Sequence, residues 1–333
     1  MLSWMRGGAA GDFDEVAVGL FGWQFERNAA YRNFCLSLGV DPKGVDGWRG
    51  IPAVPTDAFK FSGYPLRCFP EERVVRSFLT SGTTKEVRGR HDFEDLRWYE
   101  ASILGAWREL GLPDFGNPWF LAQSPGDAGH SSLSHMFGVL LDASGAVGER
   151  WLMGADGGFN GSWDGNGGGE VALFSTAIGL LRYAERFEAV ELPEGSWIFE
   201  TGGYKGLADG PGPEEFLERV SGHFGVREGR IWNEYSMTEL SSQFYRRPGE
   251  RDHCGPGWTR IRVVDPETGE EAGEGEAGYL EIVDLANVGS VLAIRTQDLA
   301  IARGASSFTL LGRDPVALPR GCSRGADDLI SKR

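Results

Sequence analysis

The sequence is poor in cysteine and in basic residues, and both shortages exclude classes of protein. Its four cysteines lie far apart in 333 residues and form no Cys-x-x-Cys pair, which argues against a zinc site and against a disulfide framework. The 48 acidic residues outnumber the 33 basic ones, so the net charge is −15, the sign that a phosphodiester backbone repels. We therefore expect no nucleic-acid partner.

Long apolar runs are missing as well. No segment approaches the roughly 18 apolar residues that a membrane span requires, and the opening residues MLSWMRGGAAGDFDEV lack the apolar centre of a signal peptide. We expect a cytoplasmic protein with no membrane span. The apolar content of 41% is that of a globular protein with a sizeable core.

What the sequence does contain is an alternation of strand-like and helix-like segments. After a helical pattern from Asp12 to about Leu38, β-branched and apolar runs predict strands and amphipathic runs predict helices. The predicted strands are 74–80, 118–123 and 196–201, and the predicted helices are 131–141, 171–187 and 212–225. Such alternation favours a largely parallel sheet covered by helices. From about Trp258, short strands at 258–265, 278–284, 290–296 and 308–312 predict a β-rich subdomain.

The stretch FLTSGTTKEVRGRH, residues 78–91, gathers hydroxyl side chains around a glycine and follows them with cations. Asp92 is predicted to cap a helix that runs to Gly111, so this loop is expected to join a strand to a helix. Backbone N–H groups and hydroxyls that converge on one point, with a glycine that lets an anion approach, predict a phosphate-binding loop. Its members are Thr80, Ser81, Gly82, Thr83 and Thr84, with Lys85, Arg88 and Arg90 adding positive charge. The alternative is an ordinary Ser/Thr turn beside a solvated basic patch.

Five short motifs are spread along the chain, and their order is part of the evidence. They are TSGTT (80–84), ETGGY (200–204), NEYSMTEL (233–240), RTQDLA (295–300) and LGRD (311–314). Together they resemble the motifs of the adenylate-forming enzymes, which join a carboxylic acid to AMP. The segments IPAVPTDAFK (51–60), GHSSLSHM (129–136) and RGCSRGADD (320–328) are similar to a narrower group, the LuxE-type acyl-protein synthetases.

This resemblance implies a fold and a domain organisation. The expected fold is α/β and resembles the N-terminal domain of the adenylate-forming enzymes, with sheets covered by helices, a β-rich C-terminal subdomain and no mobile C-terminal domain. The expected division is an α/β body at 1–257, with the phosphate-binding loop and the adenine site, and a β-rich subdomain with a cysteine-bearing tail at 258–333. Both parts are expected to form one continuous catalytic unit.

The resemblance also assigns roles in binding ATP and Mg²⁺. It places the triphosphate on Thr80–Thr84 and Lys85, and it makes Glu239 the Mg²⁺ ligand with help from Thr238. Tyr235 is expected to stack on adenine, which lies against the bare backbone of Gly202 and Gly203. Asp298 is expected to accept hydrogen bonds from the ribose. Arg313 is expected to reach the ribose or the α-phosphate and to act in catalysis with Glu239.

A second step depends on Cys322. A thiolate attacks an acyl adenylate readily, and Arg320 and Arg324 favour the ionised thiol. The predicted product is an acyl thioester that passes to a protein thiol of a reductase or carrier. Cys322 as a bystander thiol remains an alternative on the residues alone, and so does a ligase that acylates coenzyme A or a carrier directly, or a non-catalytic nucleotide-binding subunit.

The remaining candidates concern the substrate pocket and the departures from the family pattern. His130 and His135 are expected to border the pocket for the acid, although structural roles suit them equally. Gln297 and Ser236 stand where the family has glycine. The lysine that the mobile domain of other members supplies is missing, so we expect Lys85, Lys205 or Arg313 to compensate. The sequence leaves the acid, the acceptor and the oligomeric state open.

Overall fold

The computed structural model describes residues 1–80, 87–165, 168–203 and 211–314 of the chain. These residues group into two compact units. The first unit combines 1–110, 237–243 and the described residues from Cys254 onward, and the second combines 111–236 with 244–253. The predicted division at residue 257 separates the N-terminal segment from the β-rich segment, whereas the compact units group these two segments together.

The second unit is built on a parallel sheet. Its strands are β4 (Pro118–Leu121), β5 (Ala172–Thr176), β6 (Trp197–Thr201) and β7 (Ile231–Tyr235), with β8 (Phe244–Arg246) antiparallel to β7. The chain enters the first unit through β9 (Asp252–Cys254). The sequence-based expectation of a largely parallel sheet is confirmed for this unit, and the predicted strands at 118–123 and 196–201 are β4 and β6.

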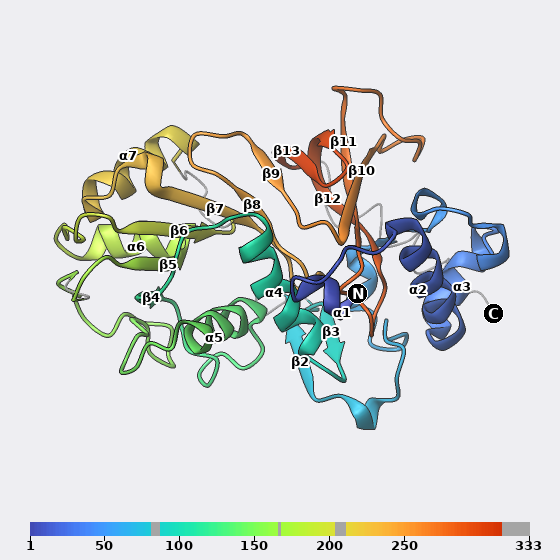
Figure 1. Cartoon of the computed structure of the whole chain (residues 1–333), viewed down its shortest axis with the longest axis horizontal. Helices are drawn as coiled ribbons and strands as arrows, with labels where there is room; N and C mark the ends of the chain where they lie inside the picture. Colours follow the sequence, from blue (N-terminus) through green and yellow to red (C-terminus); the bar gives the residue numbers. More distant parts are fainter. Residues whose placement is uncertain (81–86, 166–167, 204–210, 315–333) are drawn as a thin grey trace. The chain divides into compact units, whose positions relative to one another are not determined.

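Helices α5 (Ser132–Ser144), α6 (Ala177–Arg186) and α7 (Pro213–Phe224) surround this sheet, and η5 (Glu228–Arg230) leads into β7 (Figure 1). Alternate strand residues point to opposite faces. On one face Phe137 of α5 packs on Phe120 and Phe174, with ring centroids 5.3 and 5.6 Å apart. The other face packs against α6 and α7 through a core that includes Leu173, Ile198, Leu180, Phe216 and Val220.

One predicted helix of this unit is wrong over its first part. Residues 171–187 form β5 and then α6 instead of one helix. Ala172–Ser175 is paired in register between β4 and β6, so its apolar side chains are buried on both faces of the sheet. The helix begins where the hydroxyl of Thr176 accepts a hydrogen bond from the Gly179 amide at 2.9 Å. A continuous apolar run contains no sign of this division.

The β-rich part of the first unit is an antiparallel sheet. Its strands are β10 (Thr259–Val264), β11 (Ala277–Asp284), β12 (Ala293–Gly304) and β13 (Ser307–Arg313), which match the strands predicted after residue 258. The short strand β1 (Val54–Pro55) pairs in parallel with β12, with Val54 opposite Ile294. This pairing places the N-terminal segment beside the RTQDLA motif.

The described helices of the first unit come from its first 110 residues. They are α1 (Leu2–Met5), α2 (Phe13–Arg27), α3 (Ala29–Ser37), α4 (Arg97–Glu109), η1 (Pro42–Gly44), η2 (Trp48–Gly50), η3 (Thr56–Lys60) and η4 (Glu71–Arg73). The helical pattern predicted for 12–38 is interrupted at Asn28, whose side chain caps α3 at the Tyr31 amide. The buried amide of Gln24 on α2 donates to the Asn287 carbonyl at 2.7 Å and accepts from the Leu292 amide at 3.0 Å. Helix α2 therefore holds the segment that leads into β12.

The hydroxyl-rich loop does not join a strand to a helix. It connects β2 (Arg76–Leu79) to β3 (Arg90–Phe93), which pair antiparallel. The predicted cap at Asp92 is also wrong, because Asp92 lies in β3 and its carboxylate accepts from Arg67 and Arg90 at 2.7 and 2.6 Å. Helix α4 starts later, at Arg97. Arg90 and Asp92 bond to each other along β3, which stays paired with β2 where a helix was expected to begin.

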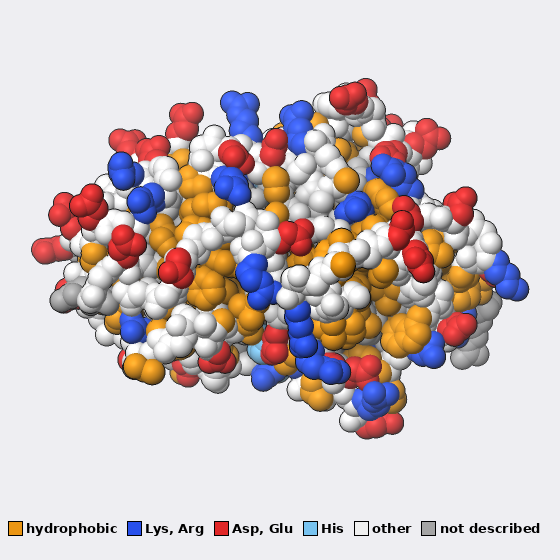
Figure 2. Space-filling model, in the orientation of Figure 1, with side chains coloured by type: hydrophobic (Ala, Val, Ile, Leu, Met, Phe, Trp, Pro, Cys, Tyr) orange, Lys and Arg blue, Asp and Glu red, His pale blue; other side chains and the backbone are white. Residues whose placement is uncertain are grey.

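The visible face of the molecule carries acidic and basic side chains interspersed with apolar ones (Figure 2). Within the described ranges, no helix is both long enough and apolar enough to cross a membrane.

Candidate active site

Hydrogen bonds hold the two ends of the hydroxyl-rich loop together at its base. Thr80 accepts a hydrogen bond on its hydroxyl from the Gly89 amide at 2.8 Å, and its own amide donates to the Gly89 carbonyl at 2.9 Å. The guanidinium of Arg88 donates to the Thr80 carbonyl at 2.6 Å. The remaining predicted phosphate-binding residues, Ser81, Gly82, Thr83, Thr84 and Lys85, lie outside the described residues. The hairpin therefore brings the two ends of the loop together at Thr80 and Gly89.

Strand β3 ties this hairpin to the NEYSMTEL motif. His91 is opposite Phe78 in the β2–β3 register, and its Nδ1 lies 2.9 Å from the carbonyl oxygen of Thr238. Burial lowers the pKa of His91 to about 4, so the ring is neutral near pH 7 and donates to that carbonyl. The base of the predicted phosphate-binding loop is thus adjacent to the segment that carries Thr238 and Glu239.

Glu239 is a buried carboxyl group in an acidic environment. Its side chain is 7% exposed, and burial raises its pKa to about 7. The charges of Asp57 and Asp298 raise this pKa further, while the cation of Lys60 lowers it. Three carboxyl groups and one lysine therefore interact electrostatically at one place in the first unit. A cation that arrives there stabilises the ionised form of Glu239.

A chain of hydrogen bonds links Lys60 and Asp57 to the RTQDLA and LGRD motifs. Lys60 donates to Asp57 at 2.7 Å, and the other oxygen of Asp57 accepts from the Gln297 amide at 3.0 Å. The Gln297 oxygen accepts from Arg313 at 2.6 Å. The glutamine that replaces the family's glycine thus connects two charged residues.

Asp57 and Lys60 are candidate site residues that the motif assignments miss. Both belong to η3, which follows β1 and is held against β12 by the pairing of Pro55 with Arg295. The segment IPAVPTDAFK carries the only available sequence signal, because it contains an acidic and a basic residue three positions apart. That spacing indicates an ion pair but not its other partners, which lie far away along the chain.

Asp298 and Arg313 are opposite each other in the β12–β13 register. Asp298 is half-buried, and its amide donates to the Thr296 hydroxyl at 3.1 Å. Arg313 is exposed apart from its contact with Gln297. The structure therefore brings five predicted residues together in the first unit, namely Thr80, Thr238, Glu239, Asp298 and Arg313.

The predicted adenine-side residues lie together in the second unit. Thr201 pairs with Glu234 in neighbouring parallel strands, so Gly202 and Tyr235, which follow them, lie at the same carboxyl edge of the sheet. This edge is where parallel α/β sheets bind ligands. Gly202 has φ of +77°, which favours glycine, and both Gly202 and Gly203 are exposed. The ring of Tyr235 is buried against Phe244 and His253, and its stacking on adenine remains a prediction.

A buried polar network lies beneath this edge. Asn233 donates to Glu200 at 2.5 Å and its amide oxygen lies 2.5 Å from the Nε2 atom of His253. Burial lowers the pKa of His253 to about 3, so this histidine is neutral and donates to Asn233. Thr201 donates to the carboxyl group of Glu234. Burial raises the pKa of Glu200 and of Glu234 to about 7.

The remaining predicted residues are more scattered. His130 is exposed in the turn before α5, and His135 is half-buried in the first turns of that helix. Their role at the acid pocket remains a prediction. Cys322 and Lys205 lie outside the described residues. Cys35 and Cys68 are buried, and burial raises the pKa of each thiol to about 12, which suits packing and not nucleophilic chemistry.

The residues present fit Mg²⁺ that arrives with a nucleotide. Among the described side chains, no group of three or more His, Cys, Asp or Glu residues is arranged to hold a metal ion by itself. Mg²⁺ is commonly held by one or two carboxylates while phosphate and water complete its shell. Glu239, whose ionised form a cation would stabilise, would supply the hard oxygen ligand that such a shell needs.

Comparison with known proteins identifies relatives over most of the chain. No family model matches it. A phenylacetate-coenzyme A ligase of Thermus thermophilus is 26% identical over 285 residues, which cover 80% of this chain and 59% of that ligase. A long-chain-fatty-acid–luciferin-component ligase of Aliivibrio fischeri is 23% identical over 313 residues, 87% of this chain and 79% of its own. The chain thus spans less than two thirds of the first of these relatives.

Solved structures agree with the fold. An open conformation of 2-hydroxyisobutyryl-CoA ligase, in complex with 2-HIB-AMP and CoA, has a TM-score of 0.64 at 14% identity and covers 90% of this chain and 74% of its own. The same ligase in a postadenylation state with 2-HIB-AMP has a TM-score of 0.65 at 15% identity, over 90% and 67% of the two chains. The chain therefore has the α/β fold of the adenylate-forming enzymes and resembles their acyl-protein synthetase branch.

Proposed function

We propose that the chain is an ATP-dependent acyl-protein synthetase. The observation that carries the proposal is the hydrogen bond from His91, close to the base of the loop, to the carbonyl of Thr238. Thr238 directly precedes the buried carboxyl group of Glu239. A loop rich in N–H groups and hydroxyls would hold the phosphates, and Glu239 would hold the Mg²⁺ that travels with them. Lys60 and Arg313 would supply positive charge where negative charge develops on the α-phosphate.

In the first step a carboxylate oxygen of the acid attacks the α-phosphorus. A bond from this oxygen to phosphorus forms, the bond between the α-phosphorus and the bridging oxygen breaks, and pyrophosphate leaves with that oxygen. Glu239 would hold the Mg²⁺ that accompanies ATP, and the charge of this ion would offset that of the phosphate oxygens. Asp298 would hold the ribose.

In the second step the thiolate of Cys322 attacks the acyl carbon. A carbon–sulfur bond forms, the bond to the phosphate oxygen breaks, and AMP leaves. The acyl group then passes to the thiol of a partner protein. The likeness to a long-chain-fatty-acid ligase supports a fatty acid as substrate.

A second candidate is a ligase that acylates coenzyme A directly. The similarity to a phenylacetate-coenzyme A ligase favours it, and in this case Cys322 has no covalent role. Both candidates share the adenylation step.

The test is exchange of labelled pyrophosphate into ATP in the presence of Mg²⁺ and a panel of fatty and aryl acids. We expect exchange that depends on one class of acid, and its absence with every acid would contradict the adenylation step. Mass spectrometry of the intact protein then separates the two candidates. An acyl adduct that persists in Cys254→Ser and is lost in Cys322→Ser supports the protein thioester, whereas acyl-CoA formation without an adduct supports direct transfer.

A further inference from the structure

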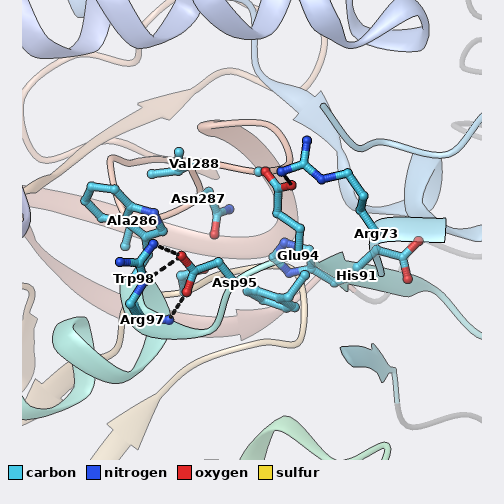
Figure 3. Close-up of a pocket in the computed structure, with 13 residues that line it drawn as sticks. Arg73, His91, Glu94, Asp95, Arg97, Trp98, Ala286, Asn287 and Val288 are labelled. Carbon is cyan, nitrogen blue, oxygen red and sulfur yellow. Dashed lines mark hydrogen bonds and ion pairs between the residues drawn. The ribbon is translucent and has the colours of Figure 1, made fainter. Parts of the chain in front are cut away.

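A cavity lies in the first unit, behind the segment that carries Glu239. Its volume is about 300 Å³, the lower end of the range for small-molecule sites. Its walls come from the end of β3 and the start of α4 on one side and from the segment after β11 on the other (Figure 3). Of the described candidate residues for ATP, Mg²⁺ or the acid, none lines it.

Charged side chains surround this cavity, but each of those in its wall has a partner of opposite charge. Arg73 contacts Glu94 at 2.6 Å, and the Nε atom of Arg97 donates to Asp95 at 2.6 Å. Asp92 is held by two arginines outside the wall. A charged ligand would have to break one of these pairs, so the wall favours an uncharged one.

Among the residues that the structure describes, two that line the cavity, Asn287 and Ser241, each have a buried oxygen atom without a hydrogen-bond partner. Asn287 is 1% exposed, and its amide nitrogen donates to the carbonyls of Glu239 and Val291 at 2.9 and 3.1 Å. These two bonds fix the amide orientation, because a flipped amide would point its oxygen at both carbonyls. Within the described part of the chain, the Asn287 oxygen and the hydroxyl oxygen of the fully buried Ser241 have no hydrogen-bond partner. Figure 3 shows the Asn287 oxygen on the side that faces Asp95.

A buried acceptor without a donor destabilises the folded protein. A ligand that supplies N–H or O–H groups recovers this free energy. Trp98, Ala286 and Val288 also line the cavity and offer apolar surface for the rest of a small molecule. We propose that this cavity binds an uncharged small molecule with a primary carboxamide, whose N–H groups donate to Asn287 and Ser241 while its apolar part lies against Trp98.

The position of the cavity gives such binding a consequence. Asn287 also supports the carbonyl of Glu239, and His91, another lining residue, supports the carbonyl of Thr238. A ligand at Asn287 therefore touches the supports of the predicted Mg²⁺ ligand. The binding itself does not depend on the proposed function and is measured without turnover.

The experiment titrates benzamide into the ¹⁵N-labelled protein and follows the indole N–H signal of Trp98, assigned with Trp98→Phe. N,N-dimethylbenzamide is the matched probe, since it keeps the ring and has no N–H donor. We expect benzamide to shift the Trp98 signal and the dimethylated probe to leave it unmoved. Equal shifts with both probes, or no shift at the solubility limit of benzamide, would overturn the proposal, because then the cavity is merely apolar or holds water only.

Two variants sharpen the test. Ser241→Ala removes one acceptor but keeps the backbone amide that donates to Asp284 at 2.9 Å, so we expect a folded protein with about five- to tenfold weaker benzamide binding. Val288→Trp fills the cavity and should abolish the shift. Its control is Val147→Trp at a position that is 83% exposed and outside the cavity wall, which should bind as the parent does. Unchanged binding in both Ser241→Ala and Val288→Trp would contradict the site.

Discussion

Glu239 in the first unit and Glu234 in the second are both buried carboxyl groups whose pKa is raised to about 7, yet their neighbours differ. Around Glu239 the interacting side chains are charged, two carboxylates and the cation of Lys60. Around Glu234 they are the hydroxyls of Thr201 and Ser236. Burial alone therefore does not distinguish a reactive carboxyl group from a structural one. The charged neighbours make the first site responsive to an arriving cation, whereas the hydroxyls that bond to the second carboxyl group are neutral.

The largest expected effect is on the first of these two groups. Glu239→Gln removes the oxygen ligand for Mg²⁺ but keeps the backbone carbonyl that accepts from Asn287, so the fold should persist. We expect acid-dependent pyrophosphate exchange to fall by about 100-fold or more. Circular dichroism and the thermal midpoint serve as the controls for folding. Exchange within a few fold of the parent would remove Glu239 from the mechanism.

The second prediction concerns stability and the other carboxyl group. Burial raises the pKa of Glu234 from 4.5 to about 7, so between these values the folded state binds more protons than the unfolded state. The free energy of unfolding should therefore fall as pH rises from about 5 to 8, by up to roughly 3 kcal/mol for this group. Glu234→Gln should reduce this slope, as measured by urea unfolding at pH 5 and pH 8. An identical slope in parent and variant would show that Glu234 is not the titrating group.

A smaller effect is expected at the cation. Lys60→Ala removes the charge beside Asp57 and should lower exchange by about tenfold. Lys60→Arg keeps the charge and should recover part of the rate, and Lys43→Ala, at an exposed lysine in η1, is the matched control. If Lys60→Ala and Lys43→Ala behave alike, the cation of the adenylation step lies elsewhere, and Lys85 or Lys205 becomes the better candidate.

The smallest effect is expected at the position that departs from the family pattern. Gln297→Gly restores the family's glycine and removes the bridge between Asp57 and Arg313. Free of this bridge, Arg313 loses its fixed position, and we expect the KM for ATP to rise a few fold with little change in kcat. Gln297→Asn tests length, since a shorter amide cannot span both contacts. A lower KM in the glycine variant would mean that the bridge restrains the arginine unproductively.

Local patterns were sufficient for much of the fold. Strands β4 and β6 and helices α5 and α7 were predicted because their apolar periodicity and their caps lie within the segments themselves. The division of 171–187 into β5 and α6 was missed because the apolar run continues through the boundary. Strand β3 was missed because it contains the charged residues Arg90 and Asp92, and because its pairing with β2 and the contact of Asp92 with Arg67 cannot be read from the segment alone.

Candidate residues for the site could be named where a motif carries its own chemistry. The resemblance named Thr238, Glu239, Asp298 and Arg313, and the structure brings them into one unit. It did not reveal Asp57 and Lys60, because their partner Gln297 is 240 residues away from Asp57. The sequence also contains no signal for the cavity at Asn287, because an unpaired acceptor can be recognised only when its three-dimensional surroundings are known.

The pairing of β1 with β12 delays assembly during synthesis. β1 has no partner strand until residues near Ile294 leave the ribosome, about 240 positions after Val54. At a rate of about 5–20 residues per second, this wait is on the order of tens of seconds. The second unit, made from a nearly continuous stretch, can bury its core in the meantime. A nascent chain halted before β12 should therefore contain a folded parallel sheet while its N-terminal hundred residues still await the strand that organises Lys60.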